Sequence, residues 1–487
     1  MRKKFIINLF FLLFLNIGIK SFWILGVDRG VQNTVNAADY GLYFALLNFS
    51  FIFNILLDFG LTNYNNRLIA QHPQLLKKHF AQLLPIKFVM AIVFSLVVFL
   101  VAIILDYDAH SLKLLSFLCL SQFLASLLLY LRSNISGLQL FKTDSILSVL
   151  DRFIVIILCS ILLWSGLLKT EFKIEYFIFT QVFAYAFSVV VAFFICIRKT
   201  GWIKLKWNKA FVIKIIKESY PYAILILLMS FYNRADGVMI ERMLNNGKQE
   251  AGIYASAFRL VDAANMVAYL FSIILLPLFS RLIKNKEDVR PIIKISFHLL
   301  LMLTICFIAI SQFYGTELMA LMYNKHIMES EAIFRVLSFC FLPISMTYIF
   351  GTLLTANGSL KQLNIVASCG MVLNIGINLI LIPHFNALGA AYSSLTAQTI
   401  TSLLQVIIAI KIFKIKTNYA YILRILLFVL CIFLTTFLIK NLNFYWMYNI
   451  IITALVMIVL SFIFRVFNIK DLITLIKSSP NKSATNF

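Results

Sequence analysis

Long, unbroken apolar runs are the feature that most limits how this chain can fold. Residues Phe94–Leu105, for example, contain no charged side chain. A helix that spans a membrane needs about 20 apolar residues, whereas the strands of a membrane β-barrel alternate apolar with polar ones. Of the 487 residues, 61% are hydrophobic and only 13% are charged, which is too few charges to cover a soluble surface. The sequence predicts an all-α integral membrane protein, and it excludes a soluble enzyme, a disordered regulator and a free nucleic-acid-binding protein.

The apolar runs of spanning length are bounded by charges or turn residues and predict about fourteen transmembrane helices. They fall at residues 5–26, 40–62, 80–105, 112–136, 145–168, 174–197, 218–240, 252–280, 291–314, 332–356, 362–383, 387–410, 420–440 and 443–464.

The distribution of Lys and Arg supports this count. With a cytoplasmic N-terminus, 28 of the 43 cations fall in cytoplasmic segments and 8 on the opposite side, as the positive-inside rule requires. Both termini are therefore expected in the cytoplasm. The basic excess (a formal net charge of +23) is assigned to the membrane surface, and no nucleic-acid partner is expected.

The spans are expected to form two lobes of six helices. Residues 1–197 make the first lobe, residues 218–410 the second, and a basic cytoplasmic linker at residues 198–217 joins them. Residues 411–465 add two further spans, and residues 466–487 form a cytoplasmic tail.

Similar sequences open the second and the eighth spans, namely Tyr40-Gly41-Leu42-Tyr43 and Ala251-Gly252-Ile253-Tyr254. Six spans separate them, so the two lobes are expected to be parallel repeats related by a pseudo-two-fold axis along the membrane normal. Folds of this kind hold a substrate between their lobes and expose it alternately to each side.

Seven cysteines lie within apolar runs without any C-x-x-C pair, and the six histidines have no ligand spacing. Neither a metal nor a redox cofactor is expected. No phosphate-binding G-x-x-x-x-G-K-[ST] motif is present, and no loop is large enough for a catalytic domain, so we expect a transporter without catalytic residues.

Several motifs together resemble one family. They are Leu57-Asp58-Phe59-Gly60-Leu61 in span 2, Arg234-Ala235-Asp236-Gly237 followed by Gly252-Ile253-Tyr254 and Phe258-Arg259-Leu260, Leu276-Pro277-Leu278-Phe279, and Asn374, Asn378 and Leu388-Gly389-Ala390-Ala391 around the span 11–12 hairpin. This arrangement is similar to the polysaccharide-exporting branch of the multidrug/oligosaccharidyl-lipid/polysaccharide exporter superfamily, the flippases of O-antigen and capsule repeat units.

The resemblance implies a flippase that moves undecaprenyl-diphosphate-linked oligosaccharides across the bacterial inner membrane. It also implies membrane lipids, a polysaccharide polymerase and chain-length proteins as partners. The alternatives are a drug/cation antiporter of the same superfamily and a flippase for the peptidoglycan lipid precursor. The antiporter is disfavoured because residues 5–26 contain no Asp or Glu and because the cations inside the membrane would repel a cationic drug.

Ionisable side chains at membrane depth are costly and normally face a wet cavity or a partner. Lys20, Lys87, Arg234 and Arg259 are the candidates for a cationic cavity that holds the diphosphate, because guanidinium and ammonium groups bind phosphate. By contrast, Arg132, Arg152 and Arg335 are placed near span ends, where their side chains are expected to reach the interface.

Acidic and amide side chains leave two interpretations open. Asp236 and Asp262 are close in sequence to Arg234 and Arg259 and can pair with them. Asp58 is either a coupling acid or a structural residue that caps a helix or forms a hydrogen bond that packs the lobe. The last pair, Asn374 and Asn378, lies on one helical face and is expected either to bond neighbouring helices or to contact sugar.

Overall fold

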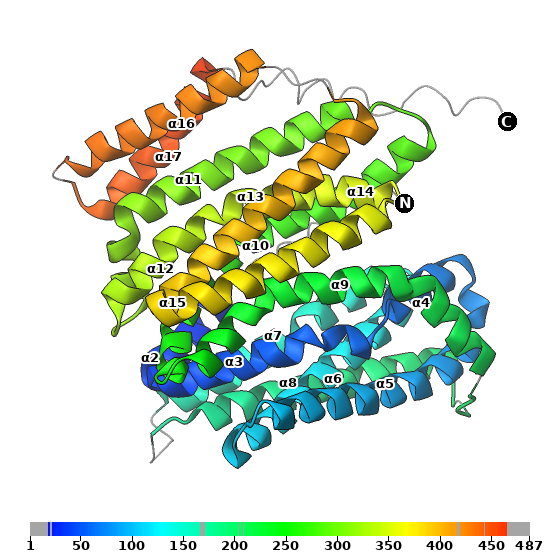
Figure 1. Cartoon of the computed structure of the whole chain (residues 1–487). Helices are drawn as coiled ribbons and strands as arrows, with labels where there is room; N and C mark the ends of the chain where they lie inside the picture. The colour runs from blue at the N-terminus through cyan, green and yellow to red at the C-terminus, as the bar shows by residue number, and fades with distance from the viewer. Residues whose placement is uncertain are drawn as a thin grey trace. The chain divides into compact units, whose positions relative to one another are not determined.

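A computed structural model describes residues 18–19, 22–165, 171–202, 204–207, 209–415, 419–442 and 444–464. All regular elements in these ranges are helices (Figure 1), which confirms the predicted all-helical class. A chain in lipid must satisfy its backbone hydrogen bonds internally, and a helix does so within one segment. Capping completes some ends, since the Asn36 side chain accepts from the amide of Asp39 at 2.7 Å and Asp108 accepts from that of Ser111 at 3.1 Å.

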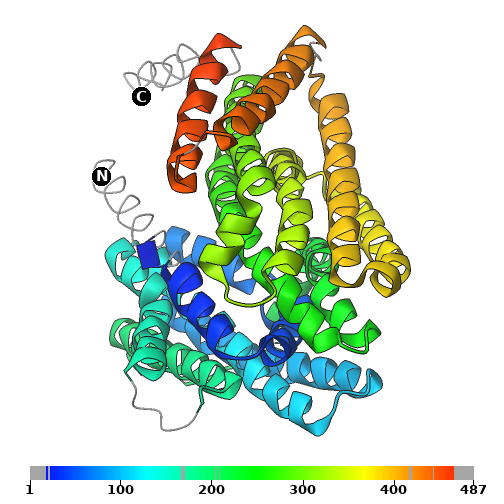
Figure 2. The same ribbon diagram turned by 90° about the vertical axis from the view of Figure 1, so that its left-hand side faces the viewer.

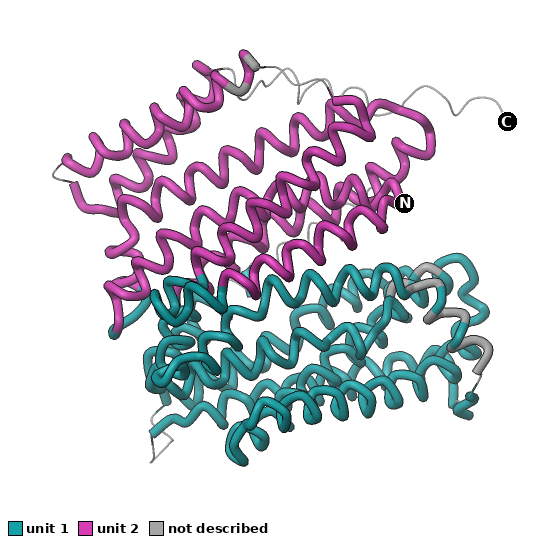
Figure 3. Tube along the Cα trace, in the orientation of Figure 1, with its two compact units in different colours: residues 1–256, 322–325, 378–390 teal, residues 257–321, 326–377, 391–487 magenta. Residues whose placement is uncertain are grey.

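The chain divides into two compact units (Figure 3). Unit 1 comprises residues 1–256, 322–325 and 378–390. Its elements are η1 (Trp23–Asp28), α2 (Arg29–Thr34), α3 (Ala37–Ile52), η2 (Asn54–Leu57), α4 (Leu61–Gln71), η3 (Pro73–Leu75), α5 (Leu76–Ile104), α6 (Ala109–Gly137), α7 (Phe141–Trp164), α8 (Ile174–Thr200), α9 (Lys209–Met243) and the start of α10 (Gly247–Lys284).

Unit 2 comprises residues 257–321, 326–377 and 391–487. It contains the rest of α10, then α11 (Arg290–Met322), α12 (Ile327–Phe339), α13 (Phe341–Met346), η4 (Thr347–Gly351), α14 (Thr352–Ala356), α15 (Leu360–Phe413), α16 (Tyr419–Lys440) and α17 (Trp446–Ile463). The last two helices lie side by side in both views (Figures 1 and 2).

Eleven helices of the described ranges are long and apolar enough to cross a membrane. One of them, α15, contains two predicted spans, because its backbone leaves the helical conformation at Asn386 (φ 51°, ψ −139°). The first predicted span lies mostly outside the described residues, and the second is interrupted after Ile52. The prediction of a multi-span membrane protein is confirmed, and these differences account for the lower number of uninterrupted helices.

The units follow packing and differ from the predicted lobes. Helix α9, which the sequence assigns to the second lobe, belongs to unit 1, where it packs along α3. A Cβ atom at Gly237 of α9 would lie 2.8 Å from the Phe44 ring, so a larger residue there would have to displace that ring. The repeat boundaries stay a prediction.

Candidate functional site

The second predicted span contains an unwound joint. Helix α3 ends at Ile52, a short 3₁₀ turn covers Asn54–Leu57, and α4 begins at Leu61. Between them Phe59 and Gly60 take positive φ values of 43° and 79°. Irregular backbone is tolerated at membrane depth only where protein or water satisfies its polar groups, so side chains must hold this joint.

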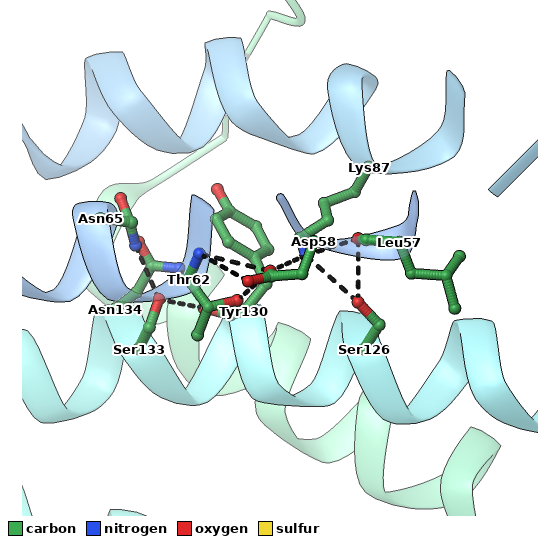
Figure 4. Close-up of polar contacts among 9 residues, drawn as sticks. All are labelled: Leu57, Asp58, Thr62, Asn65, Lys87, Ser126, Tyr130, Ser133 and Asn134. Carbon is green, nitrogen blue, oxygen red and sulfur yellow. Dashed lines mark hydrogen bonds and ion pairs between the residues drawn. The ribbon is translucent and has the colours of Figure 1, made fainter. Parts of the chain in front are cut away.

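Lys87 of α5 supplies three of those contacts. Its ammonium donates to the Leu57 carbonyl at 2.9 Å, to the Ser126 hydroxyl at 3.2 Å and to the Asp58 carboxylate (Figure 4). The Ser126 hydroxyl also donates to the Leu57 carbonyl, at 3.1 Å. An ammonium has three hydrogens, and the Lys87 side chain is only 1% exposed. In this conformation Lys87 is fully engaged with the protein.

Asp58 joins the two sides of the joint. Its carboxylate pairs with Lys87 and accepts the Thr62 hydroxyl at 2.5 Å and the Thr62 amide at 3.3 Å. A carboxylate in front of the first amides of a helix stabilises that end, so Asp58 caps α4. Its side chain is 28% exposed, and a coupling role for it stays a prediction.

Arg234 lies on α9 against α3. Its guanidinium donates to the Asn48 side chain at 3.2 Å and lies 5.2 Å from the centre of the Phe51 ring. The first contact is a hydrogen bond to an amide oxygen and the second a cation–π contact. Arg234 is half-buried, and an anion-binding role for it stays a prediction.

Asp236, two residues further along α9, is buried among donors. The Tyr254 hydroxyl donates to it at 2.9 Å and the Asn378 amide at 2.8 Å. The structure thus brings together two predicted site residues, Asp236 and Asn378, with the tyrosine of the Gly252-Ile253-Tyr254 motif. The Asn378–Asp236 contact is a hydrogen bond between two helices, as is expected of an asparagine inside a membrane.

The remaining predicted site residues are placed as follows. Arg259 is buried on the part of α10 that belongs to unit 2, and Asp262, one turn further along, is half-buried. Asn374 is buried on α15, where its side-chain amide donates to the Ser393 hydroxyl at 3.4 Å and its backbone carbonyl accepts from that hydroxyl at 2.8 Å. Lys20 lies outside the described residues.

Arg152 is a residue that the sequence analysis misjudged. Because α7 begins at Phe141 rather than at residue 145, eleven residues precede Arg152, which is roughly 16 Å of helix. Its guanidinium lies 4.5 Å from the centre of the Trp23 ring and donates to the Tyr185 hydroxyl at 3.0 Å. The expectation that Arg152 reaches the interface is wrong. The missed signal was the polar face that it shares with Ser145 and Ser148.

The other two arginines assigned to span ends are paired. Arg132 contacts Asp144 at 2.8 Å, and Arg335 pairs with Glu331 one helical turn before it. In each case the ion pair holds the arginine side chain against the protein.

A second correction concerns the first helix. The helical backbone continues through η1 and α2 to Thr34, so it includes Asp28, beyond the predicted end of span 1. Asp28 is buried and accepts the Tyr40 hydroxyl at 2.9 Å. It lies in a π-helical segment, a form that often marks functional positions. The absence of an acid from residues 5–26 therefore no longer argues against an antiporter.

Comparison with known proteins identifies relatives of this arrangement. Residues 30–283, just over half of the chain, match the polysaccharide biosynthesis protein family. The structure resembles the lipid II flippase MurJ in an inward closed conformation, with a TM-score of 0.70 and 15% identity over 95% of this chain and 100% of that one.

Two further solved structures share the fold. An inward-facing multidrug resistance MATE family transporter of the MOP superfamily has a TM-score of 0.60 and 12% identity over 80% of this chain and 94% of that one. A MOP superfamily transporter from Pyrococcus furiosus has a TM-score of 0.59 and 12% identity over 84% and 95%. No curated protein sequence matches this chain. At such identities the structural likeness establishes the fold alone.

Proposed function

Because this chain belongs to the polysaccharide biosynthesis protein family, we propose that it is a flippase for undecaprenyl-diphosphate-linked oligosaccharide repeat units. It acts by alternating access in the bacterial cytoplasmic membrane, and its product is used for O-antigen, capsule or exopolysaccharide synthesis. The observation that carries the proposal is the family match over residues 30–283, which contains the Arg234–Asp236 and Gly252–Arg259 motifs. A fold shared with a protein described as a lipid II flippase supports it.

The diphosphate is the part of this substrate that most needs cationic or polar protein contacts, since a charged phosphate without such partners cannot enter hydrocarbon. In the proposed mechanism Arg234 and Arg259 bind it, because a guanidinium offers several donors in one plane. Asn48 and Phe51 help to position the Arg234 guanidinium. Lys20 is proposed as a further cation of the same path.

Lys87 has a different role in this proposal. Its ammonium already donates to three protein acceptors, so a phosphate would have to displace one of them. We assign Lys87 and Asp58 to the joint between α3 and α4. There they hold a discontinuous helix, an element that many transporter folds contain.

The test is a flipping assay in proteoliposomes. The probe is the fluorescent lipid-linked glycan that accumulates in cells lacking this protein, and the readout is loss of label accessibility from outside. Arg234→Ala and Arg259→Ala are expected to slow flipping at least tenfold. Arg335→Ala is the matched control, since it removes an exposed arginine that pairs with Glu331, and it is expected to leave the rate within twofold.

Each result has a distinct meaning. If flipping survives both arginine substitutions, the flippase proposal stands, and the two arginines are assigned to helix packing. If the intact protein flips lipid II and not the accumulated glycan, the substrate is the peptidoglycan precursor. The buried Asp28 favours a second candidate, a drug/cation antiporter, and proton-coupled export of a cationic dye without glycolipid flipping would establish it.

A further inference from the structure

A cluster of four side chains in unit 1 has no role in the mechanism above. We call it the α7 polar cluster, and it consists of Asp151 and Arg152 of α7, Trp23 of η1 and Tyr185 of α8. The Arg152 guanidinium lies 4.5 Å from the Trp23 ring centre and 5.7 Å from that of Tyr185. It donates to the Tyr185 hydroxyl at 3.0 Å and approaches the Asp151 carboxylate at 3.5 Å.

Helix α7 has a lipid-facing side and a polar side. Five large apolar residues spaced by seven, four, four and three positions are exposed, as expected of a face turned to lipid; they are Ile146, Phe153, Ile157, Ile161 and Trp164. Ser145 and Arg152 come one position before Ile146 and Phe153, so they are rotated from the exposed residues by roughly 100° around the helix axis, and Ser148 lies on the same face as these two. Arg152 therefore lies away from the lipid-facing side.

The Arg152 side chain is nevertheless 25% exposed, and it lies near the middle of a 24-residue helix. A charged side chain at this depth is stable only against protein or water. Because Arg152 does not lie on the lipid-facing side of α7, we infer that its exposed part borders a hydrated interior of unit 1, where a polar ligand has access to it.

The charge of the cluster selects the ligand. Arg152 and Asp151 lie within ion-pair distance, so together they are neutral, and Asp151 would repel a phosphate. A sugar hydroxyl both donates and accepts, which suits a guanidinium beside a carboxylate and a phenol. The rings of Trp23 and Tyr185 hold the guanidinium in one orientation, so little entropy is lost when it binds.

We propose that the α7 polar cluster is a glycan-binding subsite, in which Arg152 and Asp151 bind hydroxyl groups of the transported oligosaccharide. This inference rests on the proposed flippase function and adds to it, since it separates recognition of the sugar from recognition of the diphosphate by Arg234 and Arg259. It predicts that changes in this cluster affect substrates according to their sugars and not according to their lipid.

The experiment compares two probes in the same proteoliposomes. One is the lipid-linked glycan that accumulates in cells lacking this protein, and the other is undecaprenyl diphosphate without sugar. Arg152→Gln keeps a planar donor group of similar length but removes charge and donors. We expect it to slow flipping of the glycolipid at least tenfold and that of undecaprenyl diphosphate less than twofold. Arg152→Lys is expected to behave like Arg152→Gln, because an ammonium lacks the planar set of donors.

The chain offers a matched control in Arg132→Gln. Arg132 of α6 pairs with Asp144, which like Asp151 belongs to α7. The two pairs are similarly buried, since the Arg132 and Asp144 side chains are 19% and 13% exposed and those of Arg152 and Asp151 are 25% and 11% exposed. This control is expected to treat both probes alike. A second readout is the fluorescence of Trp23, with the other tryptophans replaced by phenylalanine, upon addition of the glycan released from its lipid. We expect a saturable change that Arg152→Gln abolishes.

The results separate this inference from the function on which it depends. If the intact protein flips the glycolipid but Arg152→Gln slows both probes equally or neither, the subsite is disproved and the flippase stands. The same holds if the released glycan leaves Trp23 fluorescence unchanged. If the intact protein flips neither probe, the flippase proposal itself fails.

Discussion

Three cations on the described apolar helices lie beside carboxylates. Lys87, Arg132 and Arg152 each have a carboxylate within ion-pair distance. A paired charge offsets its own burial cost but has little net attraction left for an anion. This is the physical reason to assign Lys87 to the joint and not to the diphosphate.

The Lys87–Asp58 pair gives the first prediction. Removing one partner leaves a buried or half-buried charge uncompensated, which typically costs about 3–5 kcal/mol. Lys87→Met and Asp58→Asn are each expected to lower the melting temperature in detergent, measured by size-exclusion chromatography after heating. The double variant should lose less than the sum of the two losses, because it leaves no unpaired charge. Lys77→Met, which changes an exposed lysine on the same helix, is expected to have no effect.

The same variants test the alternative that Lys87 binds substrate. In that case Lys87→Met would retain normal thermal stability while flipping falls at least tenfold. This result would show that Lys87 binds substrate, and it would contradict the assignment of Lys87 to the joint between α3 and α4.

The two asparagines of α15 give a second prediction, because their partners differ in charge. Asn378 donates to the buried carboxylate of Asp236 at 2.8 Å, and Asn374 donates to a neutral serine at 3.4 Å. Hydrogen bonds to charged groups contribute about 1.5–3 kcal/mol and neutral ones about 1 kcal/mol. Asn378→Leu should therefore lower the melting temperature more than Asn374→Leu. Equal stability but weaker glycan binding in both variants would favour the sugar-contact interpretation.

Sequence reasoning identified many of these residues but not their partners. Asp58 and Lys87 are 29 positions apart, and Asp236 and Asn378 are 142 apart, so in each case the partners come from different segments of the chain. Residues two positions apart on a helix, such as Arg234 and Asp236, point to different sides, so proximity in sequence was a poor guide to pairing. Arg152 was misjudged because apolar composition does not mark where a helix begins.

At the scale of elements, the starts of α3 and α10 meet through two glycines. A Cβ atom on Gly41 would lie 1.8 Å from the Lys248 carbonyl oxygen, and one on Gly252 would lie 2.0 Å from that of Ala37. The contact is reciprocal, because each carbonyl belongs to the residue four positions before the opposite glycine. The two similar sequences found at the starts of spans 2 and 8 thus lie against each other, as expected of repeats related by a two-fold axis.

Substitution of these glycines gives the third prediction. Gly41→Val and Gly252→Val cannot be accommodated unless α3 and α10 separate, since backbone atoms occupy the space. We expect a fall in melting temperature and a loss of flipping of at least tenfold. Gly376→Ala is the matched control, because no atom lies within 4 Å of its added Cβ and alanine favours a helix over glycine by about 0.5–1 kcal/mol. Normal flipping by both valine variants would show that this contact is dispensable.

The helices themselves were largely predictable, whereas their interruptions were not. Predicted spans at 112–136 and 174–197 correspond to Ala109–Gly137 and Ile174–Thr200, because hydrocarbon thickness sets the length of an apolar run. The unwound joint in span 2 lies within an apolar run, and its local signs in the sequence are Asp58 and Gly60. Whether a helix continues there depends on Lys87 and Ser126, which come from other segments.

At the scale of the whole molecule, the distribution of Lys and Arg predicts the transmembrane topology. The predicted cytoplasmic segments contain 28 Lys and Arg and the opposite ones contain 8. A miscounted span would exchange the two sides for every segment that follows it. The positive-inside rule therefore makes each loop a separate test of the fourteen-span prediction.

Labelling of single cysteines in intact cells gives the last prediction. In a variant without native cysteines, Lys325→Cys and Asn441→Cys are expected to react with a membrane-impermeant maleimide from outside. Lys204→Cys and Glu287→Cys should react only after the cells are permeabilised. All four positions are exposed, so access depends on the side of the membrane and not on burial. Because Lys204 precedes span 7 and Asn441 follows span 13, reaction of both from the same side would mean that the intervening chain crosses the membrane an even number of times. That outcome would contradict the odd number predicted here and, with it, the cytoplasmic placement of both termini.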